Sequence, residues 1–156
     1  MANELATNRI IPFINSAAPG RRKGATATIV NEATGGRVTL RFRKPRMSSA
    51  DIRKGRDEAT LPVFIDVMDG CDNNINFSFV GTLRGASLAI SRKAKARADK
   101  ASRAKTVLDW TLAAVEADDL RTVRVLHEGV CGRCGRKLTV PESIDTGLGP
   151  VCGERR

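Results

Sequence analysis

The sequence predicts an α+β fold: an antiparallel sheet of four or five strands, one long basic helix, and a small cysteine-bearing module at the C-terminal end. Three observations predict it. Two pairs of short apolar segments are each joined by turn residues, one long Ala-, Lys- and Arg-rich stretch has helical periodicity, and three of the four cysteines lie after residue 130. We therefore expect an α+β domain over residues 1–120 and the module over residues 121–156.

The first predicted elements are a helix and a β-hairpin. Residues 5–17 predict a short helix whose isoleucines and Phe13 pack on the core. Residues 25–42 predict a hairpin, because β-branched residues flank the turn segment NEATGG. In the second strand of this hairpin, apolar residues alternate with arginine and threonine, so the two kinds of side chain fall on opposite faces.

The remaining predicted elements are three strands and one long helix. Residues 62–68 and 76–83 predict a second hairpin, and residues 121–127 predict a fifth strand. Residues 87–117 give the strongest helical signal, with Ala, Leu and Val recurring at steps of three, four and seven. The first half of this helix has little apolar area, so we expect it to project or to lie at the rim while the second half docks on the sheet.

The clustered cysteines predict a metal site. Cys131 and Cys134 form a CxxC pair whose two thiolates can reach one ion, and Cys152 follows after seventeen residues. This separation is typical of the second half of a zinc-ribbon or treble-clef-like module. In a reducing compartment, clustered cysteines bind metal more often than they pair as disulfides. The pattern therefore predicts one structural zinc ion.

Structural zinc takes four nitrogen or sulfur ligands, so the three cysteines leave one ligand to be found. His127, the only histidine, lies four residues before the CxxC pair and is the first candidate. Cys71 and Glu154 are the alternatives. Before Cys152, residues 140–146 predict a short helix, and the glycines and proline of TGLGP predict the turn that returns the chain to the site.

The segment CGRCGRKLTVPESIDTGLGPVC closely resembles a short cysteine-containing domain of unknown function that is common in phage and prophage proteins, with the pattern CxrCGRxLTxPeSixxGiGPxC. The resemblance covers Cys131, Cys134, Gly135, Arg136, Leu138, Thr139, Pro141, Ser143, Ile144, Gly147, Gly149, Pro150 and Cys152. It implies a zinc-binding protein of phage or mobile-element origin, and hence the cytoplasm of a bacterial host. It implies no reaction.

The formal net charge of +10 is concentrated in two blocks. Residues 21–56 contain eleven Lys and Arg against two Asp and Glu, a net of +9, and residues 91–105 contain seven against one, a net of +6. A clustered positive field favours an anionic partner, here nucleic acid or a host complex that handles nucleic acid. The residues expected to make these contacts are Arg21, Arg22, Lys23, Arg37, Arg41, Arg43, Lys44, Arg46, Lys95, Lys100 and Arg103.

The expected mode of nucleic-acid binding is contact with the phosphate backbone. Stacking on bases needs exposed aromatic side chains, whereas the five phenylalanines mostly occupy apolar strand positions. Lys and Arg contact phosphates without reading sequence. We therefore expect binding with little sequence preference.

Two other classes of function stay open. A basic phage protein of this kind could instead inhibit a host defence system, as an anti-CRISPR protein does, or a host polymerase, through protein–protein contacts. A metal-dependent nuclease would use Asp66, Asp69 and Asp72, but these residues fit a hairpin turn equally well, and no nucleophile set is evident, so we do not expect an enzyme. No long apolar run predicts a membrane span, and no signal peptide is expected.

Overall fold

A computed structural model describes residues 3–68, 77–120 and 122–154, without the side chains of residues 95–97 and 154. Its centre is a six-stranded antiparallel sheet with the strand order β5-β4-β3-β2-β1-β6. The predicted α+β class is confirmed, and the sheet has one strand more than expected. The strands are β1 (Ala25–Asn31), β2 (Arg37–Arg43), β3 (Phe64–Met68), β4 (Phe77–Arg84), β5 (Ser87–Ile90) and β6 (Val123–His127).

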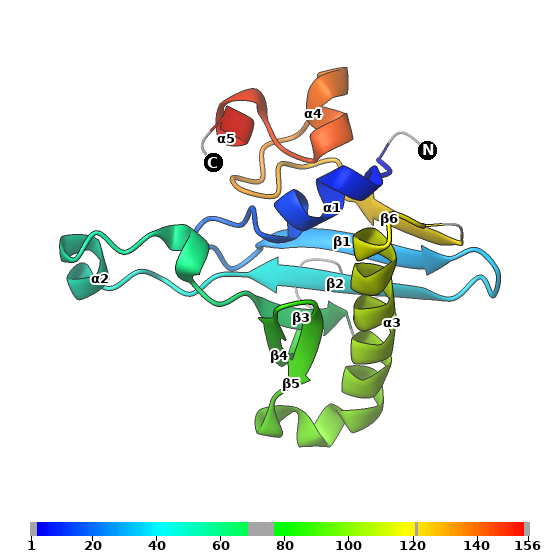
Figure 1. The fold of residues 1–156 in the computed structure, drawn as a ribbon. Helices are drawn as coiled ribbons and strands as arrows, with labels where there is room; N and C mark the ends of the chain where they lie inside the picture. Colours follow the sequence, from blue (N-terminus) through cyan, green and yellow to red (C-terminus); the bar gives the residue numbers. More distant parts are fainter. Residues whose placement is uncertain (1–2, 69–76, 121, 155–156) are drawn as a thin grey trace.

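The long helix α3 packs on one face of this sheet. Figure 1 shows α3 running across the strands, with α1 between the sheet and the pair α4 and α5. No helix in the described part of the chain is long and apolar enough to cross a membrane. The α-helices are α1 (Thr7–Ile14), α2 (Ser49–Arg53), α3 (Ala98–Glu116), α4 (Pro141–Thr146) and α5 (Pro150–Glu154), and the 3₁₀ helices are η1 (Glu58–Thr60) and η2 (Arg92–Arg97).

The additional strand is β5, which lies where the sequence predicts the start of the long helix. Gly85, with a φ of +60°, makes the tight turn from β4, and Leu88 of β5 is fully buried. This strand is too short for its two-residue alternation to be distinguished from the helical repeat that follows it in the sequence. The α-helix therefore begins at Ala98, after η2, and not at residue 87.

The first half of α3 also packs on the sheet, contrary to the expectation that it would project or lie at the rim. Ala101 and Ala104 are fully buried, and Ala94 of η2 is almost fully buried. Small side chains let the helix approach the strands closely, so these alanines complete the close packing of the core although each offers little apolar area.

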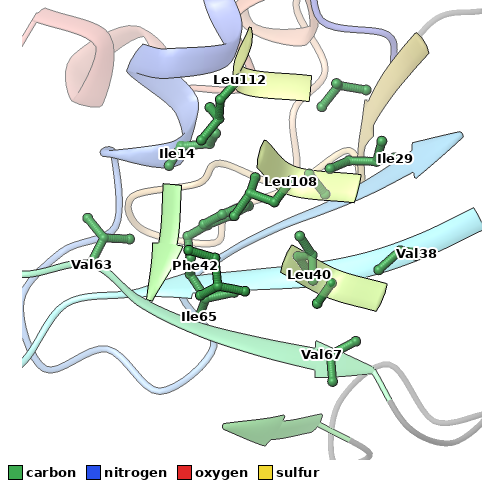
Figure 2. Close-up of a cluster of buried hydrophobic side chains, with 14 of the residues drawn as sticks. Ile14, Ile29, Val38, Leu40, Phe42, Val63, Ile65, Val67, Leu108 and Leu112 are labelled. Carbon is green, nitrogen blue, oxygen red and sulfur yellow. The ribbon is translucent and has the colours of Figure 1, made fainter. Parts of the chain in front are cut away.

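The core forms between α3, α1 and the apolar face of the sheet. Figure 2 shows side chains of β1, β2 and β3 beside Leu108 and Leu112 of α3 and Ile14 of α1. The predicted alternation on β2 is confirmed, because its apolar residues are buried in this core while Arg41 and Arg43 stay partly exposed. The arginines therefore lie on the opposite side of the sheet.

We call that opposite side of β2, β3 and β4 the open face. In the described part of the chain, the helices with extensive strand contacts are α3 and η2, which contribute to the core on the other side. Strand register sets which side chains share the open face. It includes Arg37, Thr39, Arg41, Arg43, Phe64, Asp66, Met68, Phe77, Phe79 and Thr82.

The C-terminal module, residues 128–154, has a small core of its own and rests on α1. Phe13 of α1 lies against Gly132 and Gly147, where an added Cβ would come within 2.9 and 2.5 Å of its ring. Only glycine at these two positions permits this approach. The preceding strand, β6, pairs with β1 in the large sheet. The buried residues of the module core are Cys131, Leu138 and Leu148.

Candidate metal centre and open sheet face

The CxxC pair occupies a tight hairpin. The N–H of Cys131 donates to the carbonyl oxygen of Arg136 at 2.8 Å, and the N–H of Gly135 donates to the carbonyl oxygen of Cys131 at 2.8 Å. Gly135 has a φ of +78°, which a residue with a side chain rarely adopts. This turn brings Cys131 and Cys134 side by side.

Cys152 reaches this hairpin from α5. The N–H of Gly132 donates to the carbonyl oxygen of Gly147 at 2.9 Å, which ties the chain before α5 to the hairpin. The Sγ atoms of Cys131, Cys134 and Cys152 consequently all lie within 4.8 Å of one another. Cys131 is buried, Cys152 half-buried and Cys134 exposed. The three predicted cysteines therefore form a group that could hold a metal ion, and a set of thiolates suits zinc and other soft cations.

Main-chain N–H groups favour negative charge at this site. Burial opposes ionisation of Cys131, but hydrogen bonds from the N–H groups of Gly149, Cys134 and Arg133 outweigh it and lower the pKa of Cys131 to about 7. Burial and the neighbouring thiols raise the pKa of Cys152 to about 11. A cation that binds here would therefore displace protons from the thiols that are still protonated.

Two arginines lie beside the hairpin. Arg133 forms a double hydrogen-bonded ion pair with Glu58 of η1. Arg21, which the sequence assigns to the basic surface, instead lies against Gly135, where an added Cβ would be 2.0 Å from its Nη2. The Nη1 of Arg21 is buried and has no hydrogen-bond partner among the described residues. The Arg21 guanidinium would offset part of the net negative charge that three thiolates and one divalent ion carry together, whereas Glu58 already balances the charge of Arg133.

His127 does not join the thiols. Its Nε2 lies 2.6 Å from the carbonyl oxygen of Ile144, and its Nδ1 accepts a hydrogen bond from the N–H of Gly129 at 2.9 Å. Nε2 therefore carries the proton, and both ring nitrogens are already used. The prediction of His127 as the fourth ligand is corrected: this histidine links β6 to α4. The two alternatives, Cys71 and the side chain of Glu154, lie outside the described part of the chain.

Replacing His127 with leucine is expected to leave the metal content unchanged and to lower the free energy of unfolding. The buried N–H of Gly129 and carbonyl of Ile144 would lose their partner, at a cost of about 1–3 kcal/mol. Urea unfolding and metal analysis of the purified variant test both points. Loss of metal from a variant that stays folded would restore His127 as a ligand.

Because His127 is buried, we also expect the free energy of unfolding to depend on pH. Burial lowers the pKa of His127 below its ordinary value of 6.5, so the unfolded chain takes up the proton more readily than the folded chain. The contribution of His127 to stability is therefore complete above pH 6.5 and is lost as the pH falls below that value. We expect the leucine variant to lose this part of the pH dependence of unfolding.

Two predicted binding residues, Arg41 and Arg43, both bond Asp66 on the open face. Arg41 Nε donates to Asp66 Oδ2 at 2.8 Å, and Arg43 donates to both carboxylate oxygens, at 2.5 and 2.8 Å. Asp66 is 1% exposed, and its carboxylate accepts hydrogen bonds from both arginines. Asp69 and Asp72, the other residues of the nuclease alternative, lie outside the described part of the chain.

Three phenylalanines share the open face with these arginines. The guanidinium carbon of Arg41 is 4.4 Å from the ring centre of Phe77, and that of Arg43 is 5.8 Å from the ring centre of Phe64. The rings of Phe64 and Phe79 meet edge to face, 5.9 Å between centres. All three phenylalanines are partly exposed. Sequence reasoning missed this array, although the two-residue spacing of Phe77 and Phe79 places them on one face.

The two basic blocks of the sequence meet in space. Arg37 of β2 and Lys100 and Arg103 of α3 line a groove of about 420 Å³, which also includes Thr39 and Met68 of the open face. We call these three basic residues the groove cluster. The strand and helix blocks are therefore not separate surfaces, and the groove cluster borders the open face.

The remaining basic candidates are scattered. Lys44, one of the residues expected to contact an anionic partner, is only 6% exposed, and burial lowers its pKa. That prediction is corrected: the Lys44 side chain contributes to the interior beside η1. Arg22, Lys23 and Arg46 are exposed in loops. The side chain of Lys95 lies outside the described part of the structure.

Comparison with known proteins gave a family match for the C-terminal part of the chain. Searches of curated proteins and of solved structures gave no significant match. Residues 124–156 match the model of a family of unknown function, DUF6011. The cysteine-bearing module of this chain is thus similar to an uncharacterised family, as its motif predicts.

Proposed function

We propose that the protein binds single-stranded nucleic acid on its open face. The observation that carries this proposal is the array of arginines and phenylalanines on β2, β3 and β4. Proteins that bind single strands combine aromatic side chains, on which bases stack, with cations that follow the backbone. Both components occur together here on β2, β3 and β4, each of which is paired with a neighbouring strand on both sides.

The phenylalanines favour a single strand over a duplex. Stacking of a base on an aromatic side chain contributes about 1–3 kcal/mol. In a duplex the faces of the bases are already stacked on one another and cannot reach Phe64, Phe77 or Phe79. Because every base has a flat face, we expect little sequence preference.

The arginines are positioned before any partner arrives. Asp66 fixes both guanidinium groups, so Arg41 and Arg43 lose little conformational entropy when they contact a phosphate. The carboxylate of Asp66 also balances one of the two guanidinium charges, so Arg41, Arg43 and Asp66 together carry a net charge of +1. The groove cluster adds three cations at the border of the open face, where a nucleic-acid backbone could continue.

We also infer that the ion in the cysteine group is zinc and that it holds the module together. The module core contains few fully buried residues, and a structural metal is a common way to stabilise such a small unit. A phage or mobile-element origin, and with it the cytoplasm of a bacterial host, is inferred from the resemblance of the cysteine motif.

Replacing Phe77 with leucine is expected to weaken the binding of a single-stranded oligonucleotide by about five- to a hundredfold, the loss of one stacked base. Leucine keeps an apolar side chain on the sheet, so the fold should persist. Fluorescence anisotropy with labelled single-stranded DNA and RNA measures the affinities. A duplex of the same sequence is expected to bind more weakly than either single strand.

The matched control is Trp110 on α3, which is 42% exposed on the helix that covers the other side of the sheet. Trp110→Leu should leave affinity unchanged. Equal losses from the two substitutions, or tighter binding of the duplex, would contradict the proposal. A wild-type protein that binds neither single strand at physiological salt would also contradict it, and would favour the hypothesis of a protein inhibitor.

A further inference from the structure

The segment that carries Cys152 lacks the second cysteine that the CxxC pair has. Cys131 is followed at a spacing of three by Cys134, whereas the residue three positions before Cys152 is Gly149. Among the described residues, the three thiols are gathered without a fourth side chain of a metal-binding type. A tetrahedral ion held here would have one coordination position beyond these thiolates.

Gly149 lies beside the buried thiol of the group. A Cβ added to Gly149 would meet one heavy atom within 4 Å, the Sγ of Cys131 at 3.9 Å. The φ of Gly149 is outside the left-handed region, so the backbone does not itself require glycine. The hydrogen bond from the Gly149 N–H to Cys131 keeps this position beside the thiols. Glycine therefore leaves space at the site that a side chain could occupy.

This space is continuous with a cavity that is large enough for a small molecule. The cavity has a volume of about 450 Å³, and Cys134, Gly149 and Cys152 are among the residues that line it. Half of the remaining lining residues are apolar, and Arg136 and Lys137 contribute the basic groups. A ligand that enters from this side meets the sulfur atoms directly and finds cations nearby.

We propose that a metal ion in the cysteine group is held by three protein thiolates and takes a small exogenous thiolate as its fourth ligand, through the cavity beside Gly149. This inference rests on the proposed metal binding. A sulfur donor suits the same soft ion as the cysteines, and Arg136 and Lys137 favour an anion. As the sulfur–metal bond forms, the thiol releases its proton to solvent and no electron is transferred.

Cobalt(II) is the probe, because the absorption of a cobalt–thiolate site reports the number of sulfur ligands. Wild-type protein loaded with Co²⁺ is titrated with 2-mercaptoethanol and, separately, with glutathione. We expect a saturable rise of about one third in the sulfur-to-cobalt absorption, as three thiolates become four. The Gly149→Cys variant should show the final spectrum without added thiol and should not respond to it.

The outcomes separate this inference from the metal site itself. An unchanged wild-type spectrum, or loss of cobalt from the protein when thiol is added, would overturn the inference while leaving the metal site in place. A change in the thiol-free spectrum of Cys71→Ser or Glu154→Gln would identify a fourth protein ligand and would also overturn it. Failure of the wild-type chain to bind one equivalent of cobalt would refute the metal site and the inference together.

Discussion

Replacing Cys131 with serine is expected to abolish metal binding and to unfold the C-terminal module while the six-stranded sheet stays folded. Cys131 is fully buried, and few other residues of the module are buried. Structural zinc can supply on the order of 10 kcal/mol to a small module, so the loss of one ligand removes most of what holds it together. The sheet has a separate and larger core.

Hydrogen–deuterium exchange, measured by mass spectrometry, distinguishes the two parts. Amides of residues 128–154 should lose protection in Cys131→Ser and in wild-type protein treated with a strong chelator, whereas β1 to β4 should keep theirs. Trp110→Leu is the control, since Trp110 lies on α3, outside the module, and is 42% exposed, so its loss should not change the metal content. A Cys131→Ser protein without metal but with full protection of the module would contradict a structural role for the ion.

Asp66→Ala is expected to lower the free energy of unfolding by about 3 kcal/mol, the lower end of the cost of breaking a buried ion pair. Asp66 is almost completely buried and accepts hydrogen bonds from Arg41 and Arg43. Without it, two guanidinium groups stay packed against phenylalanine rings with no carboxylate partner. The arginines keep 17% and 27% of their side-chain surface exposed, which limits the loss.

Urea unfolding of the metal-loaded proteins measures this difference. Glu32→Ala is the matched control, because Glu32 pairs with Arg124 on the surface, where both side chains are more than 40% exposed. Water solvates such a pair well, so its loss should have a much smaller effect than loss of Asp66. Equal effects of the two substitutions would show that the Asp66 cluster does not stabilise the sheet.

The sequence predicts much of the sheet because its strands have a visible period. On β2, strict alternation predicts both the buried residues and the arginine face, and both are found. The strand β5 is missed because four residues cannot establish a period beside a long Ala-rich helix. The burial of the first half of α3 is also missed. Apolar area alone does not show how closely alanines let a helix approach a sheet.

The candidate sites, like the sheet, contain features that the sequence predicts and features that it misses. The CxxC spacing predicts the cysteine group correctly, because a short loop leaves two thiols few directions to point. His127 is assigned wrongly, since nothing in the sequence shows that the main chain near Gly129 and Ile144 uses both ring nitrogens. Likewise, the bonds of Asp66 to Arg41 and Arg43 depend on strand register, which a single sequence does not give.

The open face itself is tested most directly by nuclear magnetic resonance of isotope-labelled, metal-loaded protein titrated with a single-stranded oligonucleotide. We predict saturable shifts that concentrate on β2, β3 and β4, including the Nε–H signals of Arg41 and Arg43, with smaller shifts at the groove cluster. Shifts confined to the exposed side of α3 or to the C-terminal module, or no shifts at any oligonucleotide concentration, would contradict binding at the open face.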